Sequence, residues 1–92
     1  MSFQNNVFQP GMILHEVIAG ALRSKGSTFQ DWCKTNGLSV TAARNVTFGQ
    51  SAGPRSREVL DRLIGDAGRE VVATAYRVRM EAEARKLAQV AA

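Results

Sequence analysis

The chain of 92 residues is long enough for one small domain, and its 45% hydrophobic and 22% charged residues are typical of a folded protein. Its 12 basic and 8 acidic residues give a formal net charge of +4, which favours an anionic partner such as nucleic acid. With one cysteine, Cys33, and one histidine, His15, the chain excludes an internal disulfide and a cysteine-based metal site, so we expect no metal and no cofactor.

The N-terminal segment does not predict export or membrane attachment. Residues 1–10 lack a basic region followed by a long apolar run, and no apolar stretch approaches the roughly 20 residues that span a bilayer. We therefore expect a cytoplasmic protein without membrane contact. Residues 1–10 are predicted to form an extended arm in which Phe3, Val7 and Phe8 cover one side of the core. The alternative is an arm that reaches DNA or a second subunit.

The first two predicted helices follow each other closely. Apolar residues at three- and four-residue spacing predict a helix over residues 12–25, and Gly26 is expected to end it. A second helix is predicted over residues 28–35, with Ser27 as its N-cap and Gln30 completing a capping box. The pair Asn36-Gly37 is a strong turn signal, because both residues tolerate a positive φ.

Three further helices complete the prediction of an all-α fold with five helices. Ser39 is expected to cap a third helix over residues 40–48, which Gly49 ends. Pro54 opens a fourth helix, which residues 65–68 are expected to break. The fifth helix is predicted over residues 69–89. It carries charge pairs four residues apart, which are Arg77–Glu81, Arg79–Glu83 and Glu81–Arg85. Its apolar stripe is formed by Val72, Tyr76, Met80 and Leu87. Residues 11–68 are interpreted as the main domain and residues 69–92 as a C-terminal helix.

The two short helices around Gly37 have the spacing of a helix-turn-helix. Cys33, four residues before this glycine, is small enough for the helices to approach closely. Trp32 and Leu38 flank the turn and are expected to be buried. Ala43 and Val46 are predicted to form the inner side of the third helix.

This pattern resembles the helix-turn-helix of phage repressors, of the Cro type and of the Ner-like regulators. The matching residues are Cys33, Gly37, Leu38 and Val46, whereas Ala43 is smaller and Asn36 more polar than is usual in that family. The resemblance covers about twenty residues. It implies that the third helix is a recognition helix whose N-terminal half meets base edges in the DNA major groove.

The outer side of the third helix carries residues suited to reading bases. The helical period places Val40, Thr41, Arg44 and Asn45 there if Ala43 and Val46 face inward. Arginine can donate twice to a guanine edge, asparagine can pair with adenine, and threonine or valine can meet a thymine methyl. The alternative is an exposed helix face without a ligand.

Charge along the sequence favours the same surface. Residues 32–57 contain no Asp or Glu but carry Lys34, Arg44, Arg55 and Arg57, which account for the entire net charge. We interpret a set of residues beside the recognition helix as DNA backbone contacts, namely Lys34, Ser39, Arg55 and Arg57. The alternative for the two arginines is solvated charge at a helix start, where cations oppose the helix dipole.

The hypothesis that follows is a sequence-specific regulator of transcription, of phage or phage-derived type, that binds double-stranded DNA. We expect a homodimer formed by the fifth helix, because one such module binds duplex DNA weakly. The alternative is that this helix packs on its own domain and frays at its end. Other hypotheses are a small phage-packaging, terminase-like subunit, or a protein-interaction adaptor such as an antitoxin or a module that contacts RNA polymerase. We find no enzyme site, because His15 and the serines lack the partners that catalysis requires.

Overall fold

Five α-helices make up the regular structure of residues 8–91, which are the residues that the computed structural model describes. In chain order they are α1 (Met12–Ser24), α2 (Phe29–Thr35), α3 (Val40–Thr47), α4 (Pro54–Ala67) and α5 (Arg69–Ala91). The prediction of an all-α domain with five helices is confirmed, and the predicted bounds agree to within two residues at most ends.

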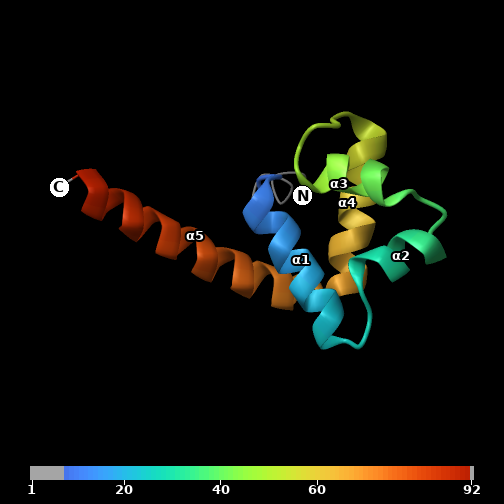
Figure 1. Cartoon of the computed structure of the whole chain (residues 1–92), viewed down its shortest axis with the longest axis horizontal. Helices are drawn as coiled ribbons and strands as arrows, with labels where there is room; N and C mark the ends of the chain where they lie inside the picture. The colour runs from blue at the N-terminus through green and yellow to red at the C-terminus, as the bar shows by residue number, and fades with distance from the viewer. Residues whose placement is uncertain (1–7, 92) are drawn as a thin grey trace.

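The first helix lies at the centre of the fold. α1 contacts each of the other four helices, as Figure 1 shows for the body of the molecule. Its Leu14 and Ile18 are completely buried, and they meet Leu63 and Ile64 of α4 and Val72 of α5 in one hydrophobic cluster. Because every helix buries its apolar stripe against α1 or α4, this small chain builds a single core.

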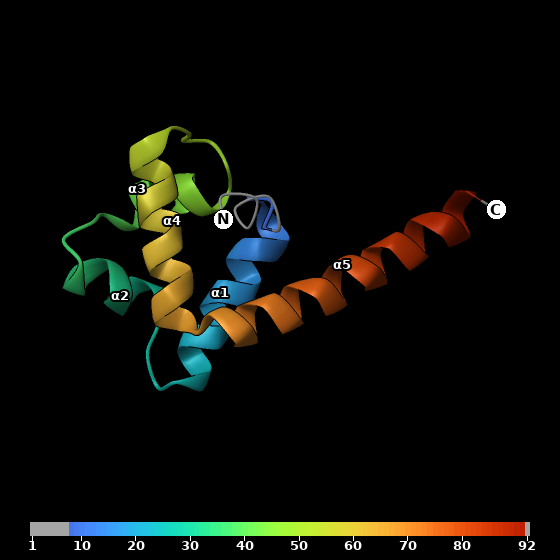
Figure 2. The same cartoon turned by 180° about the vertical axis from the view of Figure 1, so that it is seen from behind.

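The fifth helix packs on this body only with its beginning. Val72 and Tyr76 are buried, while the second half of α5 runs outward and forms one end of the 47 Å long axis (Figures 1 and 2). Phe8 meets the Tyr76 ring edge to face at 5.5 Å, and the Gln9 backbone N–H donates to the Tyr76 hydroxyl at 2.9 Å. Phe8 therefore covers the core as predicted, whereas Phe3 and Val7 lie outside the described residues.

The N-cap of α2 differs from the prediction. Thr28, not Ser27, adopts the extended cap conformation, and its hydroxyl accepts a hydrogen bond from the Asp31 backbone N–H at 3.0 Å. Ser27 belongs instead to the turn that ends α1, because its backbone N–H donates to the carbonyl of Leu22 at 3.0 Å. The capping residues are thus shifted by one position, and Gln30 plays no part in the cap.

The break between α4 and α5 also lies later than predicted. α4 continues through Gly65 to Ala67, and Gly68 with a φ of +108° ends it. A glycine inside a helix costs only about 1 kcal/mol, and burial of Ile64 and Ala67 on the inner face offsets this cost. The added turn places the Asp66 carboxylate 2.8 Å from the Trp32 Nε1, which donates to it and links α2 to α4.

The charge pairs predicted within α5 are not the ones that the structure forms. Arg79 reaches across to Glu16 on α1 at 3.0 Å, and Glu83 lies 3.8 Å from Lys86. The predicted stripe is buried only at Val72 and Tyr76, while Met80 is 40% and Leu87 is 70% exposed, because the body of the domain does not extend that far along α5. None of the helices in residues 8–91 is both long and apolar enough to cross a membrane.

Candidate nucleic-acid interface

A tight turn at Gly37 joins α2 to α3 in the helix-turn-helix arrangement. Gly37 has a φ of +70°, and its backbone N–H donates to Lys34 while the N–H of Leu38 donates to Cys33 at 2.9 Å. This pair of bonds is a Schellman motif, whose left-handed residue is best supplied by glycine. Trp32 and Cys33 are buried, and Leu38 is half-buried against the same core. The predicted turn is therefore present.

The inner side of α3 is held tightly to the rest of the domain. Ala43 and Thr47 are completely buried and Val46 is 8% exposed, so the predicted inward residues are confirmed and Thr47 joins them. Ser39 caps the helix as predicted, accepting from the Ala42 N–H at 3.0 Å. At the other end, the Gly11 N–H donates to the Thr47 carbonyl at 2.8 Å. These contacts fix both ends of an eight-residue helix.

The outer side of α3 faces solvent at two of the four predicted base-reading positions. Thr41 and Arg44 are exposed, whereas Asn45 is half-buried. Val40 is also half-buried and packs against the core cluster, so it does not stand on the fully outward side that the helical period predicted. The difference arises because Val40, three residues before Ala43, shares part of that residue's inward direction.

Two residues that the sequence analysis did not single out complete this surface. A recess on the outer side of α3 is lined by Thr41, Arg44, Asn45, Phe48 and Gln50. The Arg44 guanidinium lies over the Phe48 ring, 5.3 Å from its centroid, in a cation–π contact that restrains it. The Gln50 N–H donates to the Asn45 carbonyl at 2.8 Å, as the Schellman motif at Gly49 requires. In the sequence, Gly49 was the signal that could have located Gln50, because a helix that ends in this motif folds the next residue back over its last turn.

Behind the recess, His15 of α1 is wedged between two aromatic rings. Its ring centroid lies 4.7 Å from those of Phe29 and Phe48. Its Nδ1 is 2.9 Å from the Thr47 hydroxyl oxygen, and that hydroxyl lies 3.2 Å from the Arg44 carbonyl. The hydroxyl has one hydrogen, so both bonds form only when it donates to Arg44 and His15 Nδ1 carries a proton and donates to it.

Burial lowers the pKa of His15, and the nearby charge of Arg44 lowers this pKa further, while Glu16 opposes the effect. At neutral pH the ring is therefore uncharged and protonated on Nδ1. His15 thus joins the central helix α1 to α3 through the Thr47 hydroxyl and the Phe48 ring.

The predicted backbone-contacting residues surround α3 at exposed positions. Lys34 lies in the last turn of α2, Ser39 is the N-cap of α3, and Arg55 and Arg57 lie in the first turn of α4. Within residues 8–91, neither Lys34 nor Arg44, Arg55 or Arg57 makes an ion pair. These cations are thus free to meet an anionic ligand.

The described residues hold no group of three or more His, Cys, Asp or Glu side chains arranged to bind a metal ion. Burial raises the pKa of the Cys33 thiol, so this side chain acts as a small core residue. Comparison of the chain with protein-family models, with curated proteins and with solved structures found no match.

Proposed function

We propose that this protein binds double-stranded DNA through α3 and acts as a sequence-specific regulator of transcription. The observation that carries the proposal is the recess on the outer side of α3, where Thr41, Arg44 and Asn45 of this rigidly held helix and Gln50 of the following loop present hydrogen-bonding groups. An α-helix fits the major groove of B-form DNA, where every base pair shows a distinct pattern of donors and acceptors.

The distribution of charge supports a duplex as the ligand. All of the net charge of +4 comes from the acid-free stretch of residues 32–57, which includes α3 and the start of α4. Cations without an ion-pair partner can replace the counterions of DNA phosphates, and this exchange supplies much of the affinity of such proteins. Lys34, Arg55 and Arg57 are the residues that we assign to this role, together with the Ser39 hydroxyl.

The stiffness of the surface supports sequence reading rather than electrostatic attraction alone. Arg44 is the residue best placed to reach a guanine edge, because Phe48 holds its guanidinium from one side. Asn45 and Gln50 lie beside it and offer amides that can pair with adenine. A side chain that is already restrained loses less entropy on binding, which favours affinity as well as specificity.

The decisive experiment is selection of bound sequences from a random pool of duplex DNA, followed by mobility-shift titration of the selected sequence. We expect a short consensus, repeated as a palindrome if two copies bind together. Unchanged DNA mobility at low salt would reject the proposal and favour a protein-interaction adaptor instead.

Single alanine variants at Arg44 and Asn45 test base reading directly. Each is expected to weaken binding to the selected sequence by about 1–3 kcal/mol and to relax specificity at one base position. Arg77→Ala removes a similar charge from the exposed surface of α5 and is the matched control. Equal affinities of all three variants for the selected sequence would contradict the assignment.

Removal of the two arginines of α4 tests the phosphate contacts. The double variant R55A/R57A is expected to bind every sequence more weakly and to flatten the logarithmic salt dependence by about two units, since each phosphate contact contributes roughly 0.9. The control is R23A/R77A, which loses the same charge at exposed positions on other helices. A slope equal to that of the parent would show that these arginines do not meet phosphates.

A further inference from the structure

The strongly exposed large hydrophobic side chains of residues 8–91 gather in one part of the molecule. They lie on α5 or at the first residue of α1, and they are Met12, Val71, Val78, Met80, Leu87 and Val90. The free end of α5 points away from the body, on the side opposite α2 (Figures 1 and 2). Met80, Leu87 and Val90 share one side of α5, whereas Val71 and Val78 lie on the other. Exposed apolar surface that is concentrated on one side marks an interaction site more often than scattered residues do.

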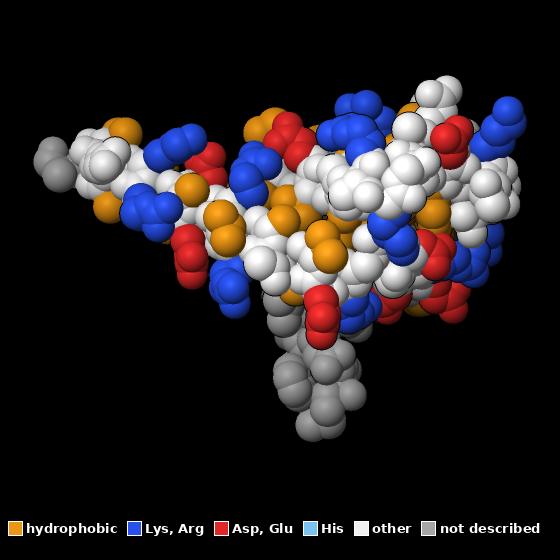
Figure 3. Space-filling model, turned by 90° about the horizontal axis from the view of Figure 1, so that it is seen from below, with side chains coloured by type: hydrophobic (Ala, Val, Ile, Leu, Met, Phe, Trp, Pro, Cys, Tyr) orange, Lys and Arg blue, Asp and Glu red, His pale blue; other side chains and the backbone are white. Residues whose placement is uncertain are grey.

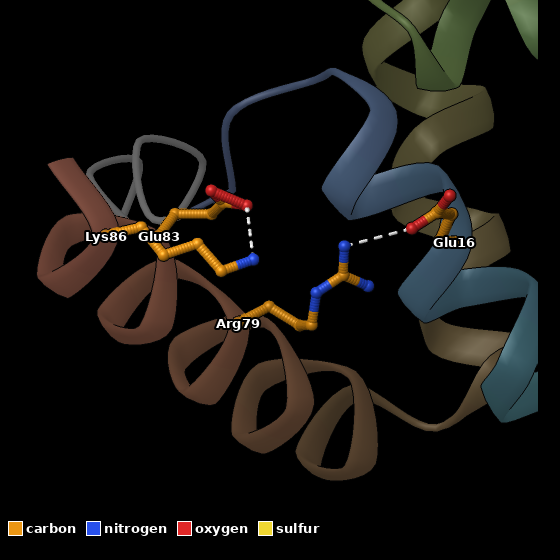
Figure 4. Close-up of polar contacts among 4 residues, drawn as sticks. All are labelled: Glu16, Arg79, Glu83 and Lys86. Carbon is orange, nitrogen blue, oxygen red and sulfur yellow. Dashed lines mark hydrogen bonds and ion pairs between the residues drawn. The ribbon is translucent and has the colours of Figure 1, made fainter. Parts of the chain in front are cut away.

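One side of α5 continues the buried stripe of the domain beyond its edge. Residues on this side follow at intervals of three and four, namely Val72, Tyr76, Met80, Glu83, Leu87 and Val90. The first two are buried, whereas Leu87 and Val90 are 70% and 84% exposed. Figure 4 shows Arg79, Glu83 and Lys86 reaching from this same side of α5 toward α1. Among residues 8–91, no other helix packs against this side of α5 over about two further turns.

A recess lies directly beside this overhanging stripe. The start of α1 and the middle of α5 line an open recess of about 420 Å³, with Met12, Tyr76, Met80 and Glu83 among its walls. Its apolar walls are large enough to receive whole aliphatic side chains. Arg79 of α5 also contacts Glu16 of α1 at 3.0 Å (Figure 4). The chain therefore carries an apolar projection, Leu87 with Val90, and an apolar recess next to each other.

The charges along this side of α5 are also complementary to one another. Glu83 stands at the rim of the recess, whereas Lys86 is the charged residue of residues 84–91 on this side, since Arg85 lies two positions after Glu83 and faces the other side of the helix. The overhang is therefore basic and the recess is bordered by a carboxylate. Figure 3 shows basic and acidic side chains alternating with hydrophobic ones along α5. A helix with this order of charges is attracted to a second copy that runs in the opposite direction.

We propose that this side of α5 is the interface of a homodimer in which two α5 helices pack antiparallel about a two-fold axis. Leu87 and Val90 of each copy enter the recess beside Met12 and Met80 of the other. Lys86 of each copy exchanges its 3.8 Å contact with Glu83 of its own chain for a contact with Glu83 of the other. Because projection and recess belong to the same chain, the contact closes at two copies and leaves no open end.

Sedimentation velocity of the full chain without DNA tests the interface. The parent is expected to move from the mass of one 10.0 kDa chain toward twice that mass as its concentration rises. Leu87→Asp is expected to raise the dissociation constant of the dimer at least about tenfold, since it buries a charge in an apolar recess. Val78→Asp places the same charge at a 52% exposed position on the opposite side of α5 and should leave the dimer intact. Circular dichroism checks that both variants keep their helices.

A charge exchange sharpens the test. Glu83→Lys and Lys86→Glu are each expected to dissociate the dimer, because like charges then face each other across the axis. An equimolar mixture of the two variants should associate again as a heterodimer. The proposal would be overturned by a parent that stays monomeric at all concentrations, by dissociation through Val78→Asp instead of Leu87→Asp, or by no recovery in the mixture. Because no DNA is present, these outcomes are separate from those that test DNA binding.

Discussion

The short helix α3 and the C-terminal helix α5 are held in opposite ways. α3 has only eight residues, yet Ala43 and Thr47 are completely buried and hydrogen bonds fix both of its ends. α5 has 23 residues, of which only Val72 and Tyr76 are buried. An isolated helix of eight residues is unstable in water, so tertiary contacts supply the order of α3. α5 instead extends far enough to leave apolar surface that residues 8–91 do not cover.

This difference shows which helix is held rigidly by tertiary contacts and which helix extends beyond them. The base reading that we propose for α3 requires side chains held within a narrow range of positions, and the contacts beneath α3 restrict them in this way. The overhang of α5 has no such contacts within the described chain, so a substitution there should barely alter the stability of the monomer. The predictions below test this contrast, beginning with the largest expected effect.

Ala43→Leu should have the largest effect on stability. The side chain of Ala43 is completely buried where α3 meets the core, and three added carbon atoms have no space there. We expect a loss of about 3 kcal/mol in the free energy of unfolding, measured by urea denaturation. Ala84→Leu on the exposed overhang is the matched control, and this substitution should change the free energy of unfolding by less than about 0.5 kcal/mol. Similar losses in both variants would remove the contrast between the two helices.

Gly37→Val tests the turn that sets the direction of α3. A valine at a φ of +70° is strained by about 2 kcal/mol, although a Cβ at this position would meet no other atom within 4 Å. We expect a lower melting temperature together with weaker DNA binding. Gly37→Asn should cost clearly less, because asparagine tolerates the left-handed region. A parent-like melting temperature in the valine variant would argue against the turn.

Thr47→Val tests the link between α1 and α3. Valine keeps the shape of threonine but leaves the His15 Nδ1 and the Arg44 carbonyl without this partner. We expect a loss of about 1–2 kcal/mol in the free energy of unfolding, and a larger relative loss for specific than for nonspecific DNA binding. Thr74→Val at an exposed position of α5 is the control. The link would be unimportant if both variants matched the parent in both measurements.

The smallest expected effect is a pH dependence that originates at His15. Its pKa is lowered by burial and by Arg44, so the folded protein binds this proton less tightly than the unfolded chain. The resulting stabilisation is complete above the ordinary pKa of about 6.5 and is lost as the pH falls through the lowered pKa. His15→Asn retains a donor for Thr47 but has no group that titrates in this range, so its stability should not fall in the same way at low pH. Parallel stability curves for parent and variant between neutral pH and pH 5.5 would contradict the prediction.

Much of the helix-turn-helix could be predicted from local signals. Gly37 and Ser39 marked the turn and the cap because both act through backbone bonds within a few residues. Ala43 and Val46 followed from the helical period. Phe48 and Gln50 could not be assigned in the same way, since their place beside Arg44 depends on how the chain folds back at Gly49. The role of His15 depended on two rings and a hydroxyl from other helices, which no local pattern indicates.

The sequence by itself determined the five helices, the turn at Gly37 and the accumulation of positive charge in residues 32–57. These features depend on interactions between near neighbours in the chain or on composition alone. Only the tertiary structure decided that Val40 leans into the core, that Arg79 pairs with Glu16 rather than Glu83, and that the stripe of α5 outruns its own domain. Each of these depends on contacts between residues that are far apart in the sequence. Those contacts are set by how the helices pack around α1.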